Sequence, residues 1–306
     1  MQGDTAVHTV EESVVGFEQW STYYRWTAES EEPQERGRPL LVLHGGPGCT
    51  HDYLVSLCDL VNDNRSVIHY DQLGNGRSTH MSEAPYDFWT VDLFLRELEN
   101  LISELGIGEY DLLGQSWGGM LAAEHALRRP PGLRNLVIAN SPASMQDWMD
   151  AAAELRSALP LEVQEALLRN EHAGTTDSQE YRAAMSEFYD RHVCRSIPTP
   201  PEVAATFEWI DTDPTVYHTM NGPSEFHVIG SLRNWSVKER LSRIQTRTLV
   251  INGAYDEATD RSVEPFVREI SGARWVRFEH SSHMPHIEER ELFMKVVADF
   301  LDGKDT

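Results

Sequence analysis

Short runs of apolar, often β-branched residues recur along the chain and end at glycine or at a polar turn. Runs of about four to eight residues with such boundaries are typical of buried strands. Before residue 140 they predict a hairpin at 13–19 and 22–27, followed by strands at 39–44, 66–70, 110–113 and 135–139. Later in the chain, two more runs predict strands at 246–253 and 273–278.

One segment between these strands has helical periodicity. In residues 90–105, Leu98, Leu101, Ile102 and Leu105 recur at helical spacing and form one apolar face. Strands that alternate with such helices indicate an α/β fold with a mostly parallel central sheet flanked by helices.

The character of the chain changes between residues 141 and 237. This stretch is rich in Ala, Glu and Leu, has a proline-rich break at 197–201 and contains several aromatic residues. We therefore predict a helical insertion over 141–237, between two parts of an α/β core at 1–140 and 238–306.

A candidate nucleophile lies directly after the strand at 110–113. Residues 114–119 read Gly-Gln-Ser-Trp-Gly-Gly. A strand that runs into Gly-x-Ser-x-Gly is the signature of a nucleophile elbow, a strained turn that exposes the serine. Gly114 and Gly118 lack a Cβ, so strand and helix can approach closely there. An ordinary strand-to-helix connection also fits these six residues, so Ser116 needs partners elsewhere in the chain.

An acid and a base follow in the expected order. Asp256 comes just after the strand at 246–253, and loops at the carboxyl ends of such strands are where α/β sheets build their sites. His283 follows the strand at 273–278, so the order Ser116, Asp256, His283 matches that of α/β-hydrolases. In this interpretation His283 takes the serine proton and Asp256 orients the imidazole.

Two other histidines, His280 and His286, flank His283. His280 follows the strand at once, and we prefer His283 because its Ser-Ser-His-Met-Pro context is the familiar one among α/β-hydrolases. Three close histidines also suggest a metal site. No cysteine or carboxylate with zinc-ligand spacing accompanies them, so we expect neither a metal nor another cofactor.

A glycine-rich loop follows the strand at 39–44. Its sequence, His-Gly-Gly-Pro-Gly at 44–48, is of the lipase and esterase type. In such loops, backbone N–H groups bind the oxyanion of a tetrahedral intermediate. The N–H groups of Gly46 and Trp117 are the predicted donors.

A second glycine-containing loop, 71–78, follows the strand at 66–70. Its glycines allow a tight turn close to the predicted site. Asp71 and Arg77 are placed to pair across the loop. We therefore interpret it as a structural support rather than a source of catalytic groups.

Composition limits the partners of the protein. The chain has 306 residues and a net charge of −23, and an acidic surface repels phosphate backbones, so nucleic acid is not an expected partner. No stretch approaches the ~20 apolar residues of a membrane helix, so we expect no membrane partner. The first residues also lack the basic start and apolar run of a signal peptide. Cys49, Cys58 and Cys194 form no disulfide framework and suit a reducing cytoplasm, where we expect the protein to be.

Taken together, the ordered motifs resemble those of the proline iminopeptidases, and most closely their tricorn-interacting aminopeptidase branch. The matching segments span nearly the whole chain and lie at 44–48, 71–78, 114–119, 221–226, 255–257 and 282–285. The resemblance implies an α/β-hydrolase fold with a helical cap inserted after the sixth core strand. It also implies a serine aminopeptidase that releases an N-terminal residue, preferentially proline, from peptides or amides through an acyl-enzyme.

The resemblance further implies that acidic residues bind the free N-terminal amine of a small peptide or amino-acid amide. By their position in the motifs these residues are Glu225 and Glu257. Carboxylates in a partly dry pocket bind an ammonium group through charge-assisted hydrogen bonds. Four aromatic residues of the cap either line a pocket for the proline ring or pack the cap's own core: Trp209, Tyr217, Phe226 and Trp235.

Two other functions stay open on the sequence alone. An L-amino-acid amidase or ester hydrolase would use the same triad and the same amine clamp with a different leaving group. A non-catalytic binding protein on this fold is a more remote alternative. Such proteins often lose a member of the triad, whereas Ser116, Asp256 and His283 are all present here. The oligomeric state is not readable from any pattern in the chain.

Overall fold

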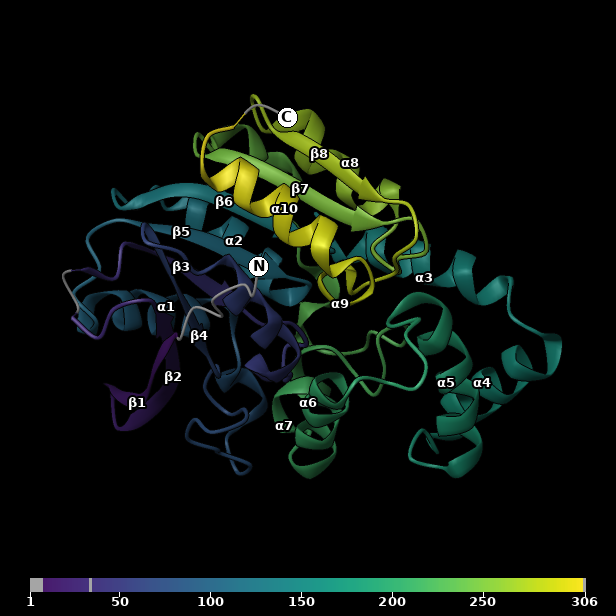
Figure 1. Ribbon diagram of the computed structural model, residues 1–306. Helices are drawn as coiled ribbons and strands as arrows, with labels where there is room; N and C mark the ends of the chain where they lie inside the picture. Colours follow the sequence, from purple (N-terminus) through teal and green to yellow (C-terminus); the bar gives the residue numbers. More distant parts are fainter. Residues whose placement is uncertain (1–7, 33–34, 305–306) are drawn as a thin grey trace.

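The centre of the molecule is an eight-stranded sheet in the order β1-β2-β4-β3-β5-β6-β7-β8 (Figure 1). The computed structural model describes residues 8–32 and 35–304, so residues 1–7, where a signal peptide would begin, lie outside the described residues. β1 and β2 form an antiparallel hairpin, β2 pairs antiparallel with β4, and the other neighbours are parallel. The strands are β1 Thr9–Phe17, β2 Trp20–Ala28, β3 Arg38–Leu43, β4 Arg65–Tyr70, β5 Tyr110–Gln115, β6 Leu133–Ala139, β7 Arg247–Gly253 and β8 Arg274–Phe278.

The predicted strands and the mostly parallel sheet are confirmed. The largest difference concerns the hairpin, where β1 begins at Thr9 rather than at residue 13. Pairing explains the extra length, because Thr9 lies opposite Ala28 in the register of the hairpin. β5 also runs on into the glycine motif, since Gly114 pairs with Leu43 of β3.

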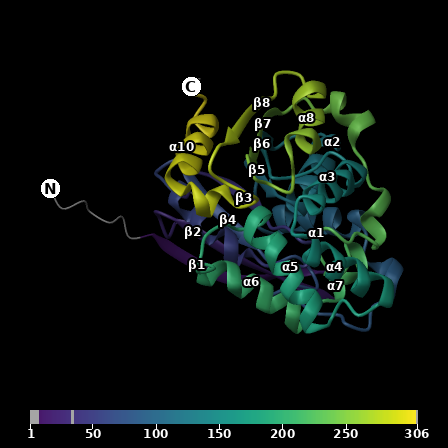
Figure 2. The ribbon, with the colours of Figure 1, turned by 90° about the vertical axis from the view of Figure 1, so that its right-hand side faces the viewer.

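Helices cover both faces of the sheet, as the edge-on view in Figure 2 shows. Leu41 and Leu43 of β3 belong to one buried cluster, and Leu40 and Val42 belong to another, because successive strand residues point to opposite faces. The first cluster is completed by α1 (Val91–Glu104), α2 (Trp117–Leu127) and α8 (Asp260–Glu269). The second is completed by the 3-10 helix η2 (His51–Leu60), the short α9 (Pro285–Glu288) and α10 (Arg290–Leu301).

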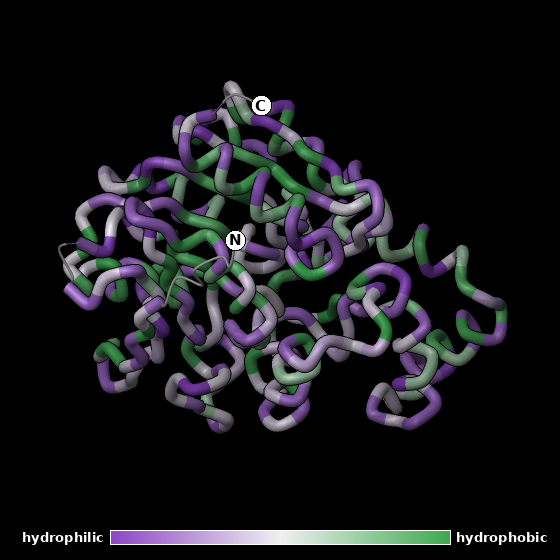
Figure 3. Tube along the Cα trace, viewed as in Figure 1, coloured by the Kyte–Doolittle hydropathy of each residue, from purple (hydrophilic) through white to green (hydrophobic). Residues whose placement is uncertain are grey.

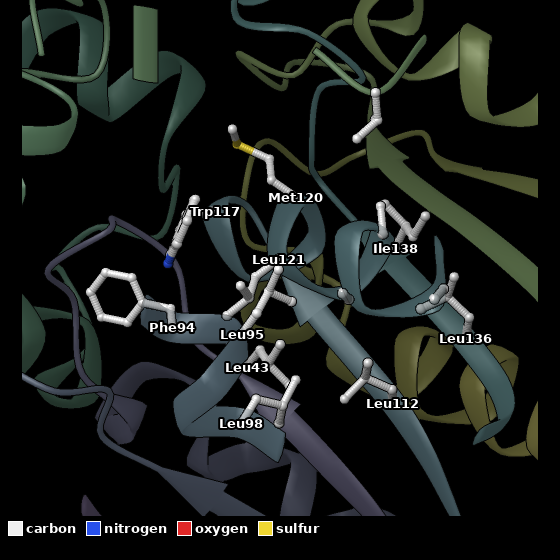
Figure 4. Packing of buried hydrophobic residues seen from close by; sticks show 14 of the residues in the cluster. Leu43, Phe94, Leu95, Leu98, Leu112, Trp117, Met120, Leu121, Leu136 and Ile138 are labelled. Carbon is white, nitrogen blue, oxygen red and sulfur yellow. The ribbon is translucent and has the colours of Figure 1, made fainter. Parts of the chain in front are cut away.

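The first cluster positions the elements that carry the site. Figure 4 shows strand residues packed against α1 and α2; labelled are Leu43, Leu112, Leu136, Ile138, Phe94, Leu95, Leu98, Trp117, Met120 and Leu121. Helix α1 begins after Thr90, whose hydroxyl accepts the N–H of Leu93 at 3.2 Å. The predicted apolar face of this helix is confirmed, with Leu98 and Leu101 fully buried.

Between β6 and β7 the chain is helical. Its elements are α3 Met145–Ser157, α4 Leu161–Ala173, α5 Gln179–His192, α6 Pro201–Thr212, α7 Thr215–Met220, η4 Ser231–Asn234 and η5 Lys238–Arg243. α4 and α5 project beside the sheet, and α6 and α7 lie below its edge in Figure 1. This part has its own apolar cluster, which includes Leu167, Tyr181, Phe188 and Phe226. The division of the chain at 141 and 237 stays a prediction, because α3 also contacts α8 of the core.

Apolar residues concentrate along the central strands, whereas the outer loops and helices are mostly hydrophilic (Figure 3). A membrane span needs about 20 apolar residues in one helix. None of the helices within residues 8–32 and 35–304 has the length and apolar character that crossing a bilayer requires.

Candidate active site

The turn between β5 and α2 holds the predicted nucleophile. Ser116 has φ 56° and ψ −124°, a backbone conformation that non-glycine residues rarely adopt. A Cβ on Gly114 would lie 2.0 Å from the Gly118 carbonyl oxygen, and one on Gly118 would lie 2.1 Å from the Leu43 carbonyl oxygen. Only glycine therefore fits at these two positions. The Ser116 N–H donates to the Ala139 carbonyl at 2.9 Å, which ties the turn to β6.

Asp256 and His283 meet beyond the ends of two neighbouring strands. Asp256 follows β7, His283 follows β8, and His283 Nδ1 lies 2.7 Å from Asp256 Oδ1. The same carboxylate accepts the Ala258 N–H at 2.8 Å and the side-chain amide of Asn140 at 2.5 Å. Because Asp256 accepts at Nδ1, the imidazole carries its proton there, and Nε2 is left for another group.

The two neighbouring histidines lie elsewhere. His286 is buried, and its Nε2 is 3.1 Å from the Tyr53 carbonyl oxygen. Burial lowers the pKa of His286 to about 3, so this side chain stays neutral. His280 is exposed, and its backbone N–H donates to Glu289. Among the three, the contact with Asp256 belongs to His283 alone.

Gln115 links the nucleophile turn to the histidine loop and to the glycine-rich loop. Its side-chain amide donates to the His283 carbonyl oxygen at 2.9 Å. Its Oε1 accepts the hydroxyl of Tyr53 at 2.5 Å, and that hydroxyl accepts the Gly45 N–H at 2.8 Å. The Ser116 hydroxyl itself makes no hydrogen bond with the described part of the chain, so it is available to a substrate.

A small, narrow cavity adjoins Ser116. Its lining includes the predicted oxyanion donors, Gly46 and Trp117. Trp117 is the first residue of α2, so its N–H has no acceptor within the helix. The rest of the lining is mostly apolar and comprises Met120, Pro142, Met145, Trp148, Asn221, Glu225 and Leu232.

Two buried carboxyl groups lie close to His283, and one of them, Glu225, also lines this cavity. Glu257 is 1% exposed, and its Oε1 lies 3.8 Å from His283 Nε2. Neither carboxyl oxygen of Glu257 has a hydrogen-bond partner within residues 8–32 and 35–304. Glu225 is 9% exposed, and its Oε1 accepts the hydroxyl of Tyr217 at 2.8 Å. The structure thus brings both predicted amine-binding residues to the side of the predicted triad.

The surroundings of both carboxyl groups disfavour the charged form. Burial raises the pKa of Glu257 well above its usual value, and the nearby carboxylates Glu225 and Asp256 raise it further. Burial also raises the pKa of Glu225, against the opposing effects of His283 and of the Tyr217 hydroxyl. A cation placed between the two groups would reverse this, because an opposite charge favours the carboxylate.

Two residues at the site were missed by reading the sequence. Trp148 of α3 donates its indole N–H to the Glu225 carbonyl at 2.7 Å, and its ring packs edge-on against His283 with centroids 5.7 Å apart. Asn140 supports Asp256 directly after β6. A signal for Asn140 existed, since it lies at the carboxyl end of a predicted strand. Nothing in the local pattern marked Trp148.

The four cap aromatics separate into different environments. Tyr217 lies at the site through its bond to Glu225. Phe226 packs within the cap's own cluster, which is the second interpretation that the sequence left open. Trp209 stacks on His80, and Trp235 donates its indole N–H to Glu124 at 3.0 Å.

The loop at 71–78 is internally bonded. The backbone N–H of Arg77 donates to Asp71 at 2.9 Å, and its guanidinium lies 3.6 Å from the same carboxylate. The predicted pairing of these two residues is thereby confirmed. Asp71 also accepts from the His51 ring at 2.8 Å. Among the described residues, no group of three or more His, Cys, Asp and Glu side chains is arranged to hold a metal ion.

Comparison with known proteins agrees with this geometry. The family model for the alpha/beta hydrolase fold matches residues 38–290. The chain is 38% identical to a proline iminopeptidase of Saccharolobus solfataricus over 87% of this chain and 85% of that protein. The crystal structure of VinJ superposes with a TM-score of 0.93 at 53% identity, over 96% of this chain and 99% of its own. A proline iminopeptidase of Mycobacterium smegmatis superposes with a TM-score of 0.88 at 48% identity, over 96% and 98% of the two chains. The chain therefore belongs to the α/β-hydrolase fold family and, within it, to the proline iminopeptidases.

Proposed function

We propose that this protein is a serine aminopeptidase that releases an N-terminal residue, preferentially proline, from a small peptide or amide. The observation that carries the proposal is the pair of buried carboxyl groups beside His283. Glu257 has two oxygens without a partner among the described residues, which is costly unless a ligand supplies the donors. A protonated amine supplies both the donors and the opposite charge.

The two carboxyl groups, which we call the amine clamp, fix which peptide bond of the substrate reaches Ser116. Glu225 lies in the helical segment between β6 and β7, and Glu257 lies in the loop after β7, so the ammonium group is held between this segment and the core. Charge-assisted hydrogen bonds to a buried carboxylate are stronger than neutral ones. The scissile carbonyl is then the one next to the bound amine. A peptide that places an internal residue in the site is excluded, because the nitrogen of an internal residue is an uncharged amide and cannot replace the ammonium group.

Acylation follows from the positions of the triad and the oxyanion donors. Ser116 Oγ attacks the carbonyl carbon while its proton passes to His283 Nε2, and Asp256 stabilises the resulting imidazolium. The N–H groups of Gly46 and Trp117 receive the developing oxyanion. His283 then gives the proton to the leaving nitrogen as the C–N bond breaks. Water, activated by the same histidine, hydrolyses the ester of Ser116 and releases the amino acid.

The preference for proline is supported by the cavity and by the relatives. The side chain of the first residue would lie against the apolar groups of Met120, Met145, Trp148 and Leu232. Pockets of this kind are mostly apolar with a few placed polar groups. The three methylene groups of the proline ring are compact and apolar and suit such a space, whereas the ring nitrogen is the amine that the two carboxyl groups bind. Relatives that cover most of the chain are named proline iminopeptidases.

We place the reaction in a reducing compartment such as the cytoplasm. All three cysteines, Cys49, Cys58 and Cys194, are free thiols. Burial raises the pKa of Cys49 and of Cys194, so both are held as unreactive thiols. Fractionation of the native host would test this placement, and recovery from the extracellular medium would contradict it.

The direct test is steady-state hydrolysis of aminoacyl arylamides, each with a free and with an acetylated amine. We expect the prolyl arylamide to have the highest kcat/KM and acetylation to abolish its turnover. Ser116→Ala should lower kcat on the order of 10⁴-fold or more. If amides or esters of other amino acids are preferred while acetylation still blocks them, the enzyme is an amino-acid amidase or esterase. Equal turnover of acetylated substrates would remove the amine clamp from the proposal.

A further inference from the structure

Gln72 lies directly after β4 and is fully buried. It makes four hydrogen bonds, and in one of them, within its own loop, the Asn75 N–H donates at 3.0 Å to the carbonyl oxygen of Gln72. Its backbone N–H donates to His44 Nε2 at 2.9 Å, and its side-chain amide donates to the His44 carbonyl oxygen at 3.0 Å. Its side-chain oxygen accepts the indole N–H of Trp117 at 2.8 Å. One side chain therefore joins the loop after β3 to the start of α2, two segments that are far apart in the sequence.

The order of the strands explains how this is possible. β3 lies between β4 and β5 in the sheet, and the three strands are parallel. Their carboxyl ends therefore meet at one edge, where His44 follows β3 and Trp117 opens α2. Gln72 reaches across the end of β3 to the first residue of α2.

The loop contacted by Gln72 is the one that carries Gly46. Burial lowers the pKa of His44 to about 4, so its ring is neutral. Its Nε2 accepts from Gln72, and the ring proton therefore lies on Nδ1, which donates to the Gly45 carbonyl at 3.0 Å. The ring thus holds the backbone directly before Gly46.

Trp117 is held on its other side by packing. Its ring is fully buried and meets Phe94 of α1 edge-to-face, with centroids 5.8 Å apart (Figure 4). With the indole N–H on Gln72 and the ring against Phe94, the side chain has one position. The backbone N–H of Trp117, the second proposed oxyanion donor, moves with it.

We infer that Gln72 is a positioning residue that sets the separation of the two oxyanion donors, Gly46 and Trp117. Its side chain bonds to His44, two residues before Gly46, and to Trp117 itself. Gln72 therefore links the two sides of the oxyanion hole, and we call this link the brace. This inference rests on the proposed acyl transfer at Ser116. It does not depend on proline preference or on the amine clamp.

Gln72→Met removes both side-chain bonds at nearly constant volume and keeps the backbone N–H to His44. Misplacing a catalytic group by about 1 Å can cost on the order of 10²-fold, so we expect kcat to fall about tenfold to a hundredfold. KM for the free-amine substrate should stay within about twofold, because the ground-state carbonyl depends little on the oxyanion donors. Affinity for a prolyl boronic acid, which forms a tetrahedral adduct on Ser116, should fall by the same factor as kcat.

Asn75→Ala is the matched control. Asn75 is a buried amide in the same loop, and its side chain donates to the Leu73 carbonyl at 3.2 Å rather than to the oxyanion loop. We expect it to lower the melting temperature without changing kcat or boronate affinity. Trp117→Phe removes the indole N–H together with part of the buried ring and should reproduce the part of the Gln72→Met loss that depends on this bond. The double variant Gln72→Met/Trp117→Phe should be slower than Gln72→Met by less than the factor that Trp117→Phe costs alone, because both changes break the same bond.

The rate constant of Ser116 labelling by a fluorophosphonate gives a readout that needs no peptide substrate. Its P=O oxygen becomes more negative as the phosphorus is attacked, so labelling should slow in Gln72→Met as well. If the fluorophosphonate labels the wild-type protein but the protein does not cleave prolyl substrates, the proposed function is refuted. The role of Gln72 can still be tested in that case, through the labelling rate. The brace is refuted if kcat, boronate affinity and labelling are unchanged in Gln72→Met. It is also refuted if kcat and substrate affinity fall together, or if Asn75→Ala behaves in the same way.

Discussion

Glu257 carries a carboxyl group into a place where water does not reach and where the described residues supply no donor. Such a group is costly in the folded state unless it is protonated or bound. Its neighbour Glu225 has one donor, the Tyr217 hydroxyl. In the proposed function an ammonium group relieves this unfavourable pair of carboxyl groups, which would favour selective binding of amines.

We expect Glu257→Gln to stabilise the fold and to weaken amine binding. The folded pKa of Glu257 is raised above its unfolded value, so the wild-type fold must take up a proton, and its stability falls as pH rises from the unfolded value through the folded one. The Glu257→Gln variant has no carboxyl group to titrate at this position, so its stability does not fall with pH for this reason. Its melting temperature should match the wild type at a pH below the unfolded value and exceed it by a few degrees at neutral pH. Removing a charge-assisted bond of about 1.5–3 kcal/mol should lower kcat/KM for prolyl arylamide about 10- to 100-fold.

Glu264→Gln is the matched control for this change, because it makes the same substitution at an exposed glutamate of α8. Its melting temperature should follow the wild type at every pH, and its kinetics should be unchanged. A Glu257→Gln protein that is less stable than the wild type at neutral pH would contradict the interpretation of an uncompensated carboxyl group.

At the scale of elements, the site depends on α3, the first helix after β6. Trp148 on this helix contacts His283, the proposed catalytic base, with its ring, and donates its indole N–H to the backbone carbonyl of Glu225. The helix begins at the Ser144 N-cap, whose hydroxyl accepts the Asp147 N–H at 3.2 Å. A single helix thus connects the position of Glu225 in the cap to that of His283 in the core.

Trp148→Phe should raise KM for prolyl arylamide about tenfold with a smaller change in kcat. The ring contact with His283 is kept, but the Glu225 carbonyl loses its donor, a loss on the order of 1–2 kcal/mol. Steady-state kinetics and the melting temperature are the measurements. Trp235→Phe is the matched control, since it also loses an indole N–H bond, to Glu124, away from the site. Equal kinetic effects in the two variants would argue against the role assigned to Trp148.

The strands and helices of this protein were predicted more accurately than their exact ends or the supporting residues of the site. The core strands and α1 follow from apolar runs and helical spacing, because local side-chain pattern decides which face of an element can be buried. The ends of the hairpin were less accurate, since β1 extends through pairing with β2 rather than through its own composition. Trp148 and Gln72 were not predicted as site residues, because their roles depend on contacts between segments far apart in the sequence.

For the whole molecule, charge is the dominant feature. The chain has 49 acidic and 26 basic residues, which leaves 23 negative charges in excess. Many arginines are already paired at the surface, for example Arg128 with Asp92 and Glu99. Such exposed pairs contribute little individually, about 0–1 kcal/mol. The unpaired excess therefore works against the compact state through mutual repulsion.

We expect the melting temperature at pH 7 to rise by a few degrees between low salt and about 0.15 M NaCl. At that ionic strength the screening length is about 8 Å, which weakens repulsion across the surface more than it weakens close ion pairs. Thermal unfolding at fixed pH and increasing NaCl measures the effect. The rise should vanish at a lower pH where protonated carboxyls bring the net charge near zero. A melting temperature that falls with salt at pH 7 would show that the ion pairs outweigh the excess charge.

The sequence by itself determined the α/β pattern, the strained turn at Ser116 and the order along the chain of the proposed acid and base. These features are local, because a glycine pair, an apolar run or a motif acts within a few residues. Tertiary structure decided which histidine meets Asp256, which cap aromatic reaches Glu225, and how deeply Glu257 is buried. Those outcomes depend on the ends of strands that neighbour each other only in the folded sheet, and on a cap that covers them. Distances and burial across such a junction are set by packing of the whole molecule, and no single segment contains them.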